Sequence, residues 1–195
     1  MHLFVYLHGF RSSPSSAKAL LTRESIDRLI AQGIDLAWYG PQLPPSPSLA
    51  VEMVTAFINR KKYCKLSIIG SSLGGYYATY LAEYYGQDCL TTLLNPAIEP
   101  ARDLEKYIGE QTSWHDDEIF YFRKEYIQEL KDLYISKITY PNRYQLLAAK
   151  DDEVLSYEEM VGKYPGTYQH ILDSGGHAIS NYSDYLSKVL EFHLD

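Results

Sequence analysis

The chain has 195 residues, the length of one ordinary domain, and its 46% hydrophobic and 22% charged residues support a sizeable core and exclude disorder. A net charge of −7 argues against nucleic acid and anionic membranes as partners, and no apolar run approaches the ~20 residues that a membrane span needs. Two cysteines without metal-ligand spacing are too few for a disulfide framework, so we expect a single domain over residues 1–195 in the reducing cytoplasm.

Short β-rich runs alternate along the chain with longer segments of helical period, which is typical of a parallel sheet covered by helices on both faces. The pattern predicts a three-layer α/β fold with a mostly parallel sheet of about six strands. The strands are expected over residues 3–8, 34–38, 66–69, 90–94, 144–149 and 168–172. The helices are expected over residues 17–31, 49–60, 74–85, 157–161 and 182–192.

The segment between the fourth and fifth predicted strands is long, charged and of helical period. We expect no strand within residues 102–133, and we interpret residues 100–135 as a helical, lid-like insertion. Because it follows a parallel strand, the insertion should emerge at the carboxyl edge of the sheet and cover a site there. Ordinary packing of amphipathic helices explains its apolar side chains equally well. These side chains are Trp114, Ile119, Phe120, Tyr121 and Phe122.

A G-x-S-x-G motif, Gly70-Ser71-Ser72-Leu73-Gly74, joins the third predicted strand to the helix that follows it. In this context the motif predicts a nucleophile elbow, a sharp turn that raises the Ser72 hydroxyl above the sheet. Gly70 and Gly74 suit the turn because they carry no side chain to collide across it. The alternatives are a turn that serves only packing and a phosphate-binding loop. A phosphate loop would require a lysine near Gly75, and a dinucleotide-binding loop would require glycine in place of Ser72.

A nucleophilic serine requires a base and an acid that orients the base, and in this arrangement the acid and then the histidine follow the serine. His177 comes just after the sixth predicted strand, where the base is required, whereas the other histidines lie at unsuitable positions. The acid should follow the fifth strand, where Asp151, Asp152 and Glu153 are adjacent. We favour Asp152, because Val154 can anchor the turn in the core, and Asp151 and Glu153 remain alternatives.

The first predicted strand ends in His8-Gly9-Phe10. A small residue such as Gly9 lets the backbone approach a reacting centre, so the N–H of Phe10 can stabilise an oxyanion together with the N–H of Leu73. We interpret His8 as a structural hydrogen-bonding residue. Arg11 lies near the expected mouth of the site and could contact an anionic group on a substrate, although an ordinary surface arginine is the simpler interpretation.

Further motifs follow one another along nearly the whole chain: Tyr6-Leu7-His8-Gly9-Phe10, Ser12-Ser13-Pro14, Ser16-Ala17-Lys18-Ala19, Pro41-Gln42-Leu43-Pro44-Pro45, the segment 70–79, Asn95-Pro96-Ala97, Asp152-Glu153-Val154-Leu155 and Gly175-Gly176-His177-Ala178. Together they resemble the motifs of the YqiA-type bacterial esterases. This resemblance implies a small α/β-hydrolase that acts on acyl esters or thioesters, with Ser72, Asp152 and His177 as its triad. It does not extend to the insertion, so no substrate preference is implied.

The first strand already ends in the oxyanion element, so it corresponds to the third strand of the usual eight-stranded hydrolase sheet. We therefore expect the second strand beside the first on one side, the third strand on the other, and the site at this switch point.

The predicted reaction is acyl transfer to water through an acyl-enzyme on Ser72, with a small-molecule substrate and with no metal or organic cofactor. Arg11, Trp114 and Phe120 are candidate substrate contacts. A peptidase or amidase with the same triad, a cofactor-free haloperoxidase, and a non-catalytic binding protein on a hydrolase fold are the alternatives. The oligomeric state is left open.

Overall fold

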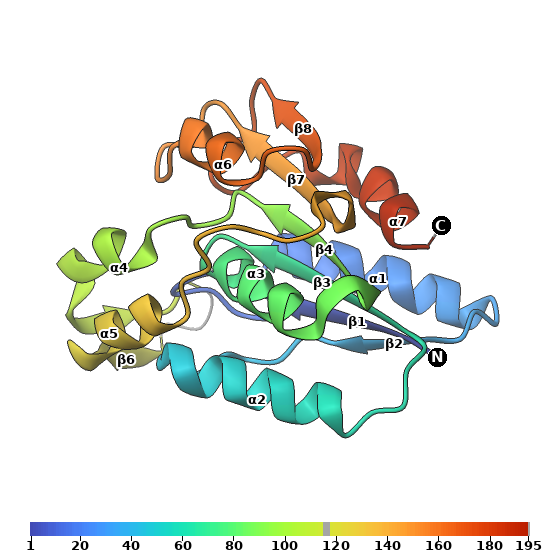
Figure 1. Cartoon of the computed structure of the whole chain (residues 1–195), viewed down its shortest axis with the longest axis horizontal. Coiled ribbons are helices and arrows are strands. Elements are labelled where there is room, and N and C mark those ends of the chain that lie inside the picture. The colour runs from blue at the N-terminus through green and yellow to red at the C-terminus, as the bar shows by residue number, and fades with distance from the viewer. Residues whose placement is uncertain (115–117, 195) are drawn as a thin grey trace.

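A six-stranded sheet runs through the computed structural model of the protein, which describes residues 1–114 and 118–194 (Figure 1). The strand order is β2-β1-β3-β4-β7-β8, and all neighbouring strands in it are parallel. The predicted positions of the second and third strands on either side of the first are therefore confirmed. The strands are β1 (His2–Leu7), β2 (Leu36–Tyr39), β3 (Lys65–Ser71), β4 (Cys89–Leu94), β7 (Tyr144–Ala149) and β8 (Tyr168–Leu172).

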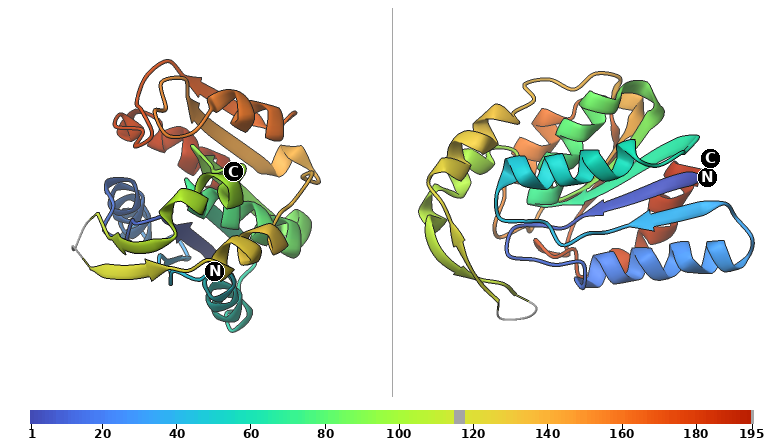
Figure 2. Two further views of the ribbon diagram at one scale, coloured as in Figure 1. Left: turned by 90° about the vertical axis from the view of Figure 1, so that its left-hand side faces the viewer. Right: turned by 90° about the horizontal axis from the view of Figure 1, so that it is seen from below.

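Helices cover both faces of this sheet, as the alternation of elements predicts. The helices are α1 (Ala17–Ala31), α2 (Pro47–Asn59), α3 (Leu73–Tyr85), α6 (Tyr157–Lys163) and α7 (Leu186–Leu194). Along β1, Phe4 and Tyr6 pack with α1 and α7, whereas Leu3, Val5 and Leu7 pack with α2 and α3. The right-hand view of Figure 2 shows α1 and α2 on opposite faces of the sheet. Short 3-10 helices are η1 (Gly86–Asp88), η2 (Glu105–Tyr107), η3 (Pro141–Arg143) and η4 (Tyr182–Asp184).

The insertion between β4 and β7 differs from the all-helical segment expected for residues 100–135. It contains helices α4 (Pro100–Asp103) and α5 (Glu125–Asp132), and between them an antiparallel pair of strands, β5 (Gly109–Thr112) and β6 (Ile119–Phe122). The prediction of no strand here is wrong because aromatic and β-branched residues favour β structure, and four of them follow one another in β6. The left-hand view of Figure 2 shows this pair at the carboxyl edge of the sheet.

The insertion is anchored to the rest of the fold by hydrogen bonds from α5 to α2 and α3. Glu129 accepts hydrogen bonds from the Ser46 hydroxyl (2.6 Å) and the Ser48 N–H (3.0 Å) at the start of α2. The Tyr76 hydroxyl of α3 donates to the carbonyl oxygen of Leu130 (2.5 Å). These hydrogen bonds fix α5, which follows the strand pair in the chain, against the helices that cover the sheet.

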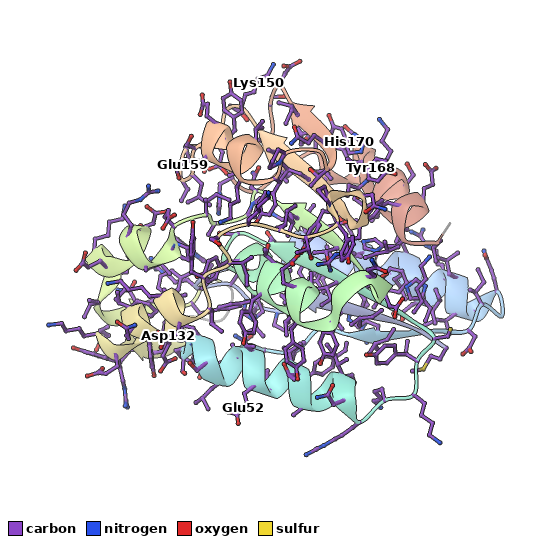
Figure 3. The ribbon with its side chains drawn as sticks, in the orientation of Figure 1. Glu52, Asp132, Lys150, Glu159, Tyr168 and His170 are labelled. Carbon is purple, nitrogen blue, oxygen red and sulfur yellow. The ribbon has the colours of Figure 1, made fainter. Side chains whose placement is uncertain are left out.

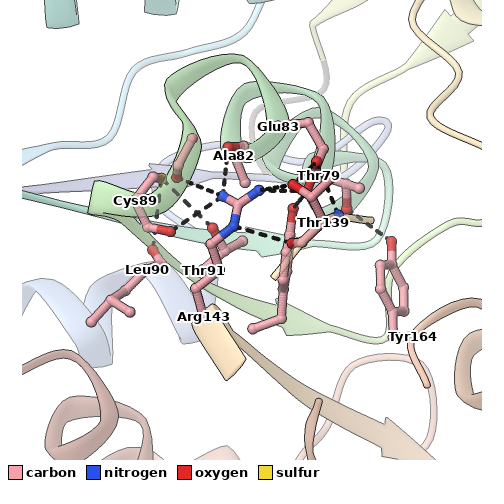
Figure 4. Close-up of polar contacts among 11 residues, drawn as sticks. Thr79, Ala82, Glu83, Cys89, Leu90, Thr91, Thr139, Arg143 and Tyr164 are labelled. Carbon is pink, nitrogen blue, oxygen red and sulfur yellow. Dashed lines mark hydrogen bonds and ion pairs between the residues drawn. The ribbon is translucent and has the colours of Figure 1, made fainter. Parts of the chain in front are cut away.

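A buried arginine joins the end of α3 to the start of β7 (Figure 4). Arg143 donates to the carbonyl oxygens of Ala82 (2.5 Å) and Gly86 (2.9 Å), at the carboxyl end of α3, and to the Glu83 carboxylate (2.5 Å). Glu83 also accepts a hydrogen bond from the Thr139 hydroxyl (2.6 Å). The guanidinium therefore adds hydrogen bonds at the carboxyl end of α3, and the Glu83 carboxylate balances its charge.

Replacing Arg143 with methionine should lower the free energy of unfolding by about 3–5 kcal/mol, because it leaves the Glu83 carboxylate without the cation that balances its charge. Urea denaturation followed by far-ultraviolet circular dichroism measures this change. Adding Glu83→Gln to the Arg143→Met variant should restore part of the loss, since no unpaired charge then remains buried. A single variant as stable as the wild-type chain would contradict this role.

Two buried histidines lie on the α7 side of the sheet. His2 contacts the Ser67 hydroxyl through Nε2 (2.7 Å), and His193 contacts the Thr92 hydroxyl through Nε2 (2.8 Å). Burial lowers the pKa of His2 to about 4 and that of His193 to about 3. Both side chains are therefore neutral in the folded protein at pH 5, whereas the unfolded chain binds protons at these residues below pH ~6.5.

Stability should consequently fall as the pH drops from 7 to 5, because the unfolded state takes up protons that the folded state does not. We expect the two histidines together to lower the free energy of unfolding by about 3–4 kcal/mol over this range. Urea titrations at pH 7, 6 and 5 measure the dependence, and His2→Asn should remove about half of it. If the free energy of unfolding depends equally on pH in the wild-type protein and in His2→Asn, His2 is not a source of the dependence.

Candidate active site

Ser72 occupies a sharp turn between β3 and α3. Its backbone has φ 54° and ψ −121°, a conformation that a residue with a side chain rarely adopts. A Cβ at position 70 would overlap the backbone of Gly74, and a Cβ at position 74 would overlap the backbone of Leu7. The two glycines flanking Ser72 are therefore required for the turn, as the G-x-S-x-G motif predicts.

The structure brings Ser72, His177 and Asp152 together. His177 Nε2 lies 3.1 Å from Ser72 Oγ, and His177 Nδ1 lies 2.9 Å from Asp152 Oδ2. The Asp152 side chain is fully buried and His177 is 24% exposed. The serine hydroxyl, the imidazole and the buried carboxylate thus form one hydrogen-bonded chain, with the partly exposed imidazole in the middle.

Asp152 is held by its own turn rather than by the core contact that we expected from Val154. Its Oδ1 accepts hydrogen bonds from the N–H groups of Val154 (2.8 Å) and Leu155 (2.9 Å), which leaves Oδ2 to face His177. The Val154 side chain is 59% exposed, so the proposed anchor is wrong. The Asp152 carboxylate supplies the constraint itself, as aspartates in turns often do.

Asp151 and Glu153 also face the histidine loop, although their side chains are exposed. Asp151 accepts hydrogen bonds from the N–H groups of Gly176 (2.9 Å) and Gly175 (3.2 Å), and Glu153 accepts one from the N–H of His177 (2.9 Å). The three successive carboxylates therefore have different roles. Asp152 contacts the imidazole of His177, and Asp151 and Glu153 bind the backbone of the loop that carries His177.

Asn95 holds the same loop from the interior of the protein. It belongs to the motif Asn95-Pro96-Ala97, but no role was assigned to it from the sequence. It is fully buried at the end of β4, with a φ of 42°, and its Oδ1 accepts a hydrogen bond from the N–H of Ala149 (2.8 Å). Its Nδ2 donates to the carbonyl oxygens of Gly176 (3.0 Å) and His177 (3.2 Å). A polar side chain directly after a buried strand and before a proline was the available signal.

Lys18 of α1 completes the support of the loop. Its Nζ donates to the carbonyl oxygen of Ala178 (2.5 Å), and burial lowers the pKa of its ammonium group to about 8 while the charge of Asp152 opposes that shift. The loop with His177 is therefore held by residues of α1, β4 and the turn after β7.

These contacts give Asp151 and Glu153, the alternative acids of the sequence analysis, a role in holding the histidine loop. Asp151→Asn and Glu153→Gln keep an oxygen acceptor, so each should stay within about tenfold of the wild-type rate. The double variant Asp151→Ala/Glu153→Ala loses three hydrogen bonds to the loop and should lower kcat about tenfold or more with little change in KM. Asp173→Ala is the matched control, because Asp173 lies in the same segment and contacts Lys150 instead. Equal kinetics in all of these variants would exclude the positioning role.

The residues expected to supply an oxyanion site lie beside Ser72. A Cβ at position 9 would lie 3.0 Å from the Cβ of Ser72, so Gly9 does allow the β1–α1 loop to approach the serine. Leu73 is the first residue of α3. His8 is a structural residue as expected: its Nε2 accepts a hydrogen bond from the N–H of Leu43 (3.0 Å), and its Nδ1 lies 2.9 Å from the Gly9 carbonyl oxygen.

A cavity of about 350 Å³ adjoins this loop. Phe120 and Arg11 line it, but Trp114 does not: it is 67% exposed and packs on the outer side of Arg11, whose guanidinium lies 4.1 Å from the Trp114 ring. Arg11 Nε also donates to the carbonyl oxygen of Thr112 (2.6 Å) and thereby joins the β1–α1 loop to β5. The described residues that line it are His8, Gly9, Phe10, Arg11, Ser12, Gln42, Leu43, Pro44, Pro45, Met53, Leu73, Tyr77, Ser113, Glu118 and Phe120.

Within residues 1–114 and 118–194, no group of three or more histidine, cysteine, aspartate or glutamate side chains could hold a metal ion. In the same described part of the chain, none of the helices combines the length and the apolar character needed to cross a membrane.

Solved structures with the α/β-hydrolase fold share this architecture. Est1E from Butyrivibrio proteoclasticus with bound ferulic acid has a TM-score of 0.72 and 14% identity, covering 100% of this chain and 90% of that chain. The esterase domain of a Rhodothermus marinus protein has a TM-score of 0.69 and 20% identity, with coverages of 96% and 84%. Mouse alpha/beta hydrolase domain-containing protein 10 has a TM-score of 0.70 and 14% identity, with coverages of 97% and 89%. At these identities the likeness establishes the α/β-hydrolase fold.

The model of one protein family matches residues 3–194, nearly the whole chain. The chain therefore belongs to the uncharacterised protein family UPF0227, the YqiA-like family that its motifs indicate.

Proposed function

We propose that this protein is a serine hydrolase that cleaves small-molecule acyl esters or thioesters through an acyl-enzyme. The observation that carries the proposal is the hydrogen-bonded chain from Ser72 Oγ through His177 to the buried carboxylate of Asp152. It lies at the carboxyl edge of the sheet beside the switch point between β1 and β3, where α/β folds bind their ligands. The partner is a small-molecule substrate.

In the first half of the reaction, Ser72 Oγ attacks the substrate carbonyl carbon while His177 Nε2 accepts the hydroxyl proton. Asp152 keeps the Nδ1 proton directed toward itself and stabilises the imidazolium that forms. The carbonyl oxygen gains negative charge and accepts hydrogen bonds from the N–H groups of Phe10 and Leu73. Leu73 is the first residue of α3, where the helix dipole stabilises a negative charge.

The tetrahedral intermediate then collapses, and the leaving oxygen or sulfur takes the proton from His177 Nε2 as it departs. Water attacks the resulting acyl-enzyme with His177 as the base, and the same two N–H groups stabilise the second oxyanion. Release of the carboxylic acid restores the Ser72 hydroxyl.

The descriptions of two proteins with the same fold are consistent with this chemistry. One is an esterase domain, and Est1E is described with a bound aromatic carboxylic acid. These names support an esterase assignment, while the triad geometry would equally serve a peptidase or amidase.

A fluorophosphonate probe and a substrate panel test the proposal together. The wild-type protein should be labelled on Ser72, and it should hydrolyse p-nitrophenyl esters and acyl thioesters faster than matched p-nitroanilides. Faster cleavage of the anilides would favour the peptidase alternative. Halogenation that depends on halide and peroxide would favour the haloperoxidase alternative. A folded protein that is neither labelled nor active would favour a binding protein on a hydrolase fold.

A further inference from the structure

The 350 Å³ cavity is lined in part by Leu73, the residue next to Ser72, and neither Ser72 nor His177 is among the described residues that line it. It is lined by the β1–α1 loop, the proline-rich segment 42–45, α2, the start of α3 and the strand pair of the insertion. No lining residue comes from the segments after β7 and β8, which carry Asp152 and His177. Phe10 and Leu73, the two residues of the proposed oxyanion site, are among its lining residues.

We propose that this cavity binds the acyl group of the substrate, and that the leaving group lies on the His177 side. This inference rests on the proposed esterase function. In the tetrahedral intermediate the carbon carries Ser72 Oγ, the oxyanion, the acyl group and the leaving group. The leaving oxygen must lie close to His177 Nε2 to receive its proton, so the acyl group takes a direction away from that nitrogen. The cavity suits that direction, because its lining includes no residue of the segments that carry Asp152 and His177.

The walls of the cavity suit an apolar group. On the outer wall, β6 alternates in exposure: Phe120 lines the cavity, Phe122 is buried, and Ile119 and Tyr121 are 64% and 61% exposed. Phe10 contacts the rings of Phe120 and Phe122, with centroids 5.9 and 5.2 Å apart in edge-to-face geometry. The strand pair thus presents one aromatic face to the proposed acyl group and the other face to solvent.

The remaining walls support the same occupant. Leu43, Met53 and Tyr77 add apolar surface from the opposite side. Among the residues that the structure describes, two charged residues line the cavity, Arg11 and Glu118, and their charges are opposite. Arg11 is already bound to the Thr112 carbonyl oxygen and the Trp114 ring. An uncharged, apolar acyl group of moderate size therefore fits better than an acyl group with a terminal carboxylate.

Two ester series distinguish the acyl side from the leaving-group side. In the first, p-nitrophenyl acetate, butyrate, hexanoate and octanoate share one leaving group. In the second, butyrate esters of phenols with equal pKa but different bulk share one acyl group. We expect kcat/KM to rise by up to about fourfold per methylene along the first series, and to vary little along the second. A strong dependence on leaving-group bulk with none on acyl length would overturn the assignment.

Matched variants test which residues of the cavity determine the preference for acyl length. Phe120→Ala should weaken the preference for hexanoate over acetate about tenfold, whereas Tyr121→Ala, the next residue of β6 with its side chain in solvent, should leave it unchanged. Met53→Phe should narrow the cavity and lower the rate on octanoate more than on acetate. Glu52→Ala is its control, because Glu52 projects away from the sheet on the outer side of α2 (Figure 3).

The two hypotheses fail in different ways. If the wild-type protein cleaves none of the esters and Ser72 is not labelled, the proposed function is wrong. If hydrolysis is normal but Phe120→Ala and Met53→Phe both keep the wild-type acyl preference, the esterase function stands and the acyl cavity is wrong.

Discussion

Ser72→Ala should lower ester hydrolysis by on the order of 10³-fold or more while the protein folds normally. The change removes one oxygen atom that faces the site, and the glycines and backbone hydrogen bonds that shape the turn remain. The Ser72 N–H donates to the Leu94 carbonyl oxygen (3.0 Å) and the Ser72 carbonyl oxygen accepts from the N–H of Ala97 (3.0 Å), and alanine preserves both contacts.

Steady-state hydrolysis of p-nitrophenyl butyrate measures the rate, and urea denaturation checks the fold. Ser71→Ala is a useful control, because Ser71 is the adjacent buried serine at the end of β3 and takes no part in the proposed reaction. An active Ser72→Ala variant would remove Ser72 from the mechanism.

Asp152→Asn should lower kcat by roughly 10³–10⁴-fold near neutral pH, the scale of the same change in the serine-protease template. The contacts of Asp152 explain why. Because Oδ1 accepts from two backbone N–H groups, the asparagine oxygen should keep that position and the amide NH₂ should face His177 Nδ1. The imidazole would then hold its proton on Nε2, the nitrogen that must accept the proton of Ser72.

The neighbouring carboxylates provide the comparison. Rates of Asp151→Asn and Glu153→Gln within about tenfold of wild type would assign the acid to Asp152 alone. A large loss in Asp151→Asn with normal activity in Asp152→Asn would move the assignment by one residue, and normal activity in all three would reduce the site to a Ser72–His177 pair.

Much of the fold could be predicted because its signals are local. The buried strands read as short apolar runs and the elbow has a distinctive motif, so the six-stranded sheet and the place of Ser72 follow from the pattern. The strand pair of the insertion was missed because β6 has only four residues and lies in a charged segment of apparently helical period. A short strand contains too few residues for its alternating pattern to be distinguished from the period of a helix.

The support of the histidine loop could not be predicted, because it depends on contacts between residues distant in sequence. Asn95 and His177 are 82 residues apart, and Lys18 and Ala178 are 160 apart. The turn at Asp152 was misjudged for a different reason: hydrophobicity suggested that Val154 anchors it, whereas a side-chain-to-backbone hydrogen bond does so. Such bonds depend on the local backbone path, which composition does not reveal.

Direct detection of the acyl-enzyme tests the central claim most closely. The protein is mixed with p-nitrophenyl butyrate, quenched in acid within the first turnovers and analysed by mass spectrometry of the intact chain and its peptides. The account predicts a mass increase of one butyryl group, located on the peptide that contains Ser72, together with a burst of nitrophenol. Rapid turnover without any adduct on Ser72, or an adduct on another residue, would contradict it.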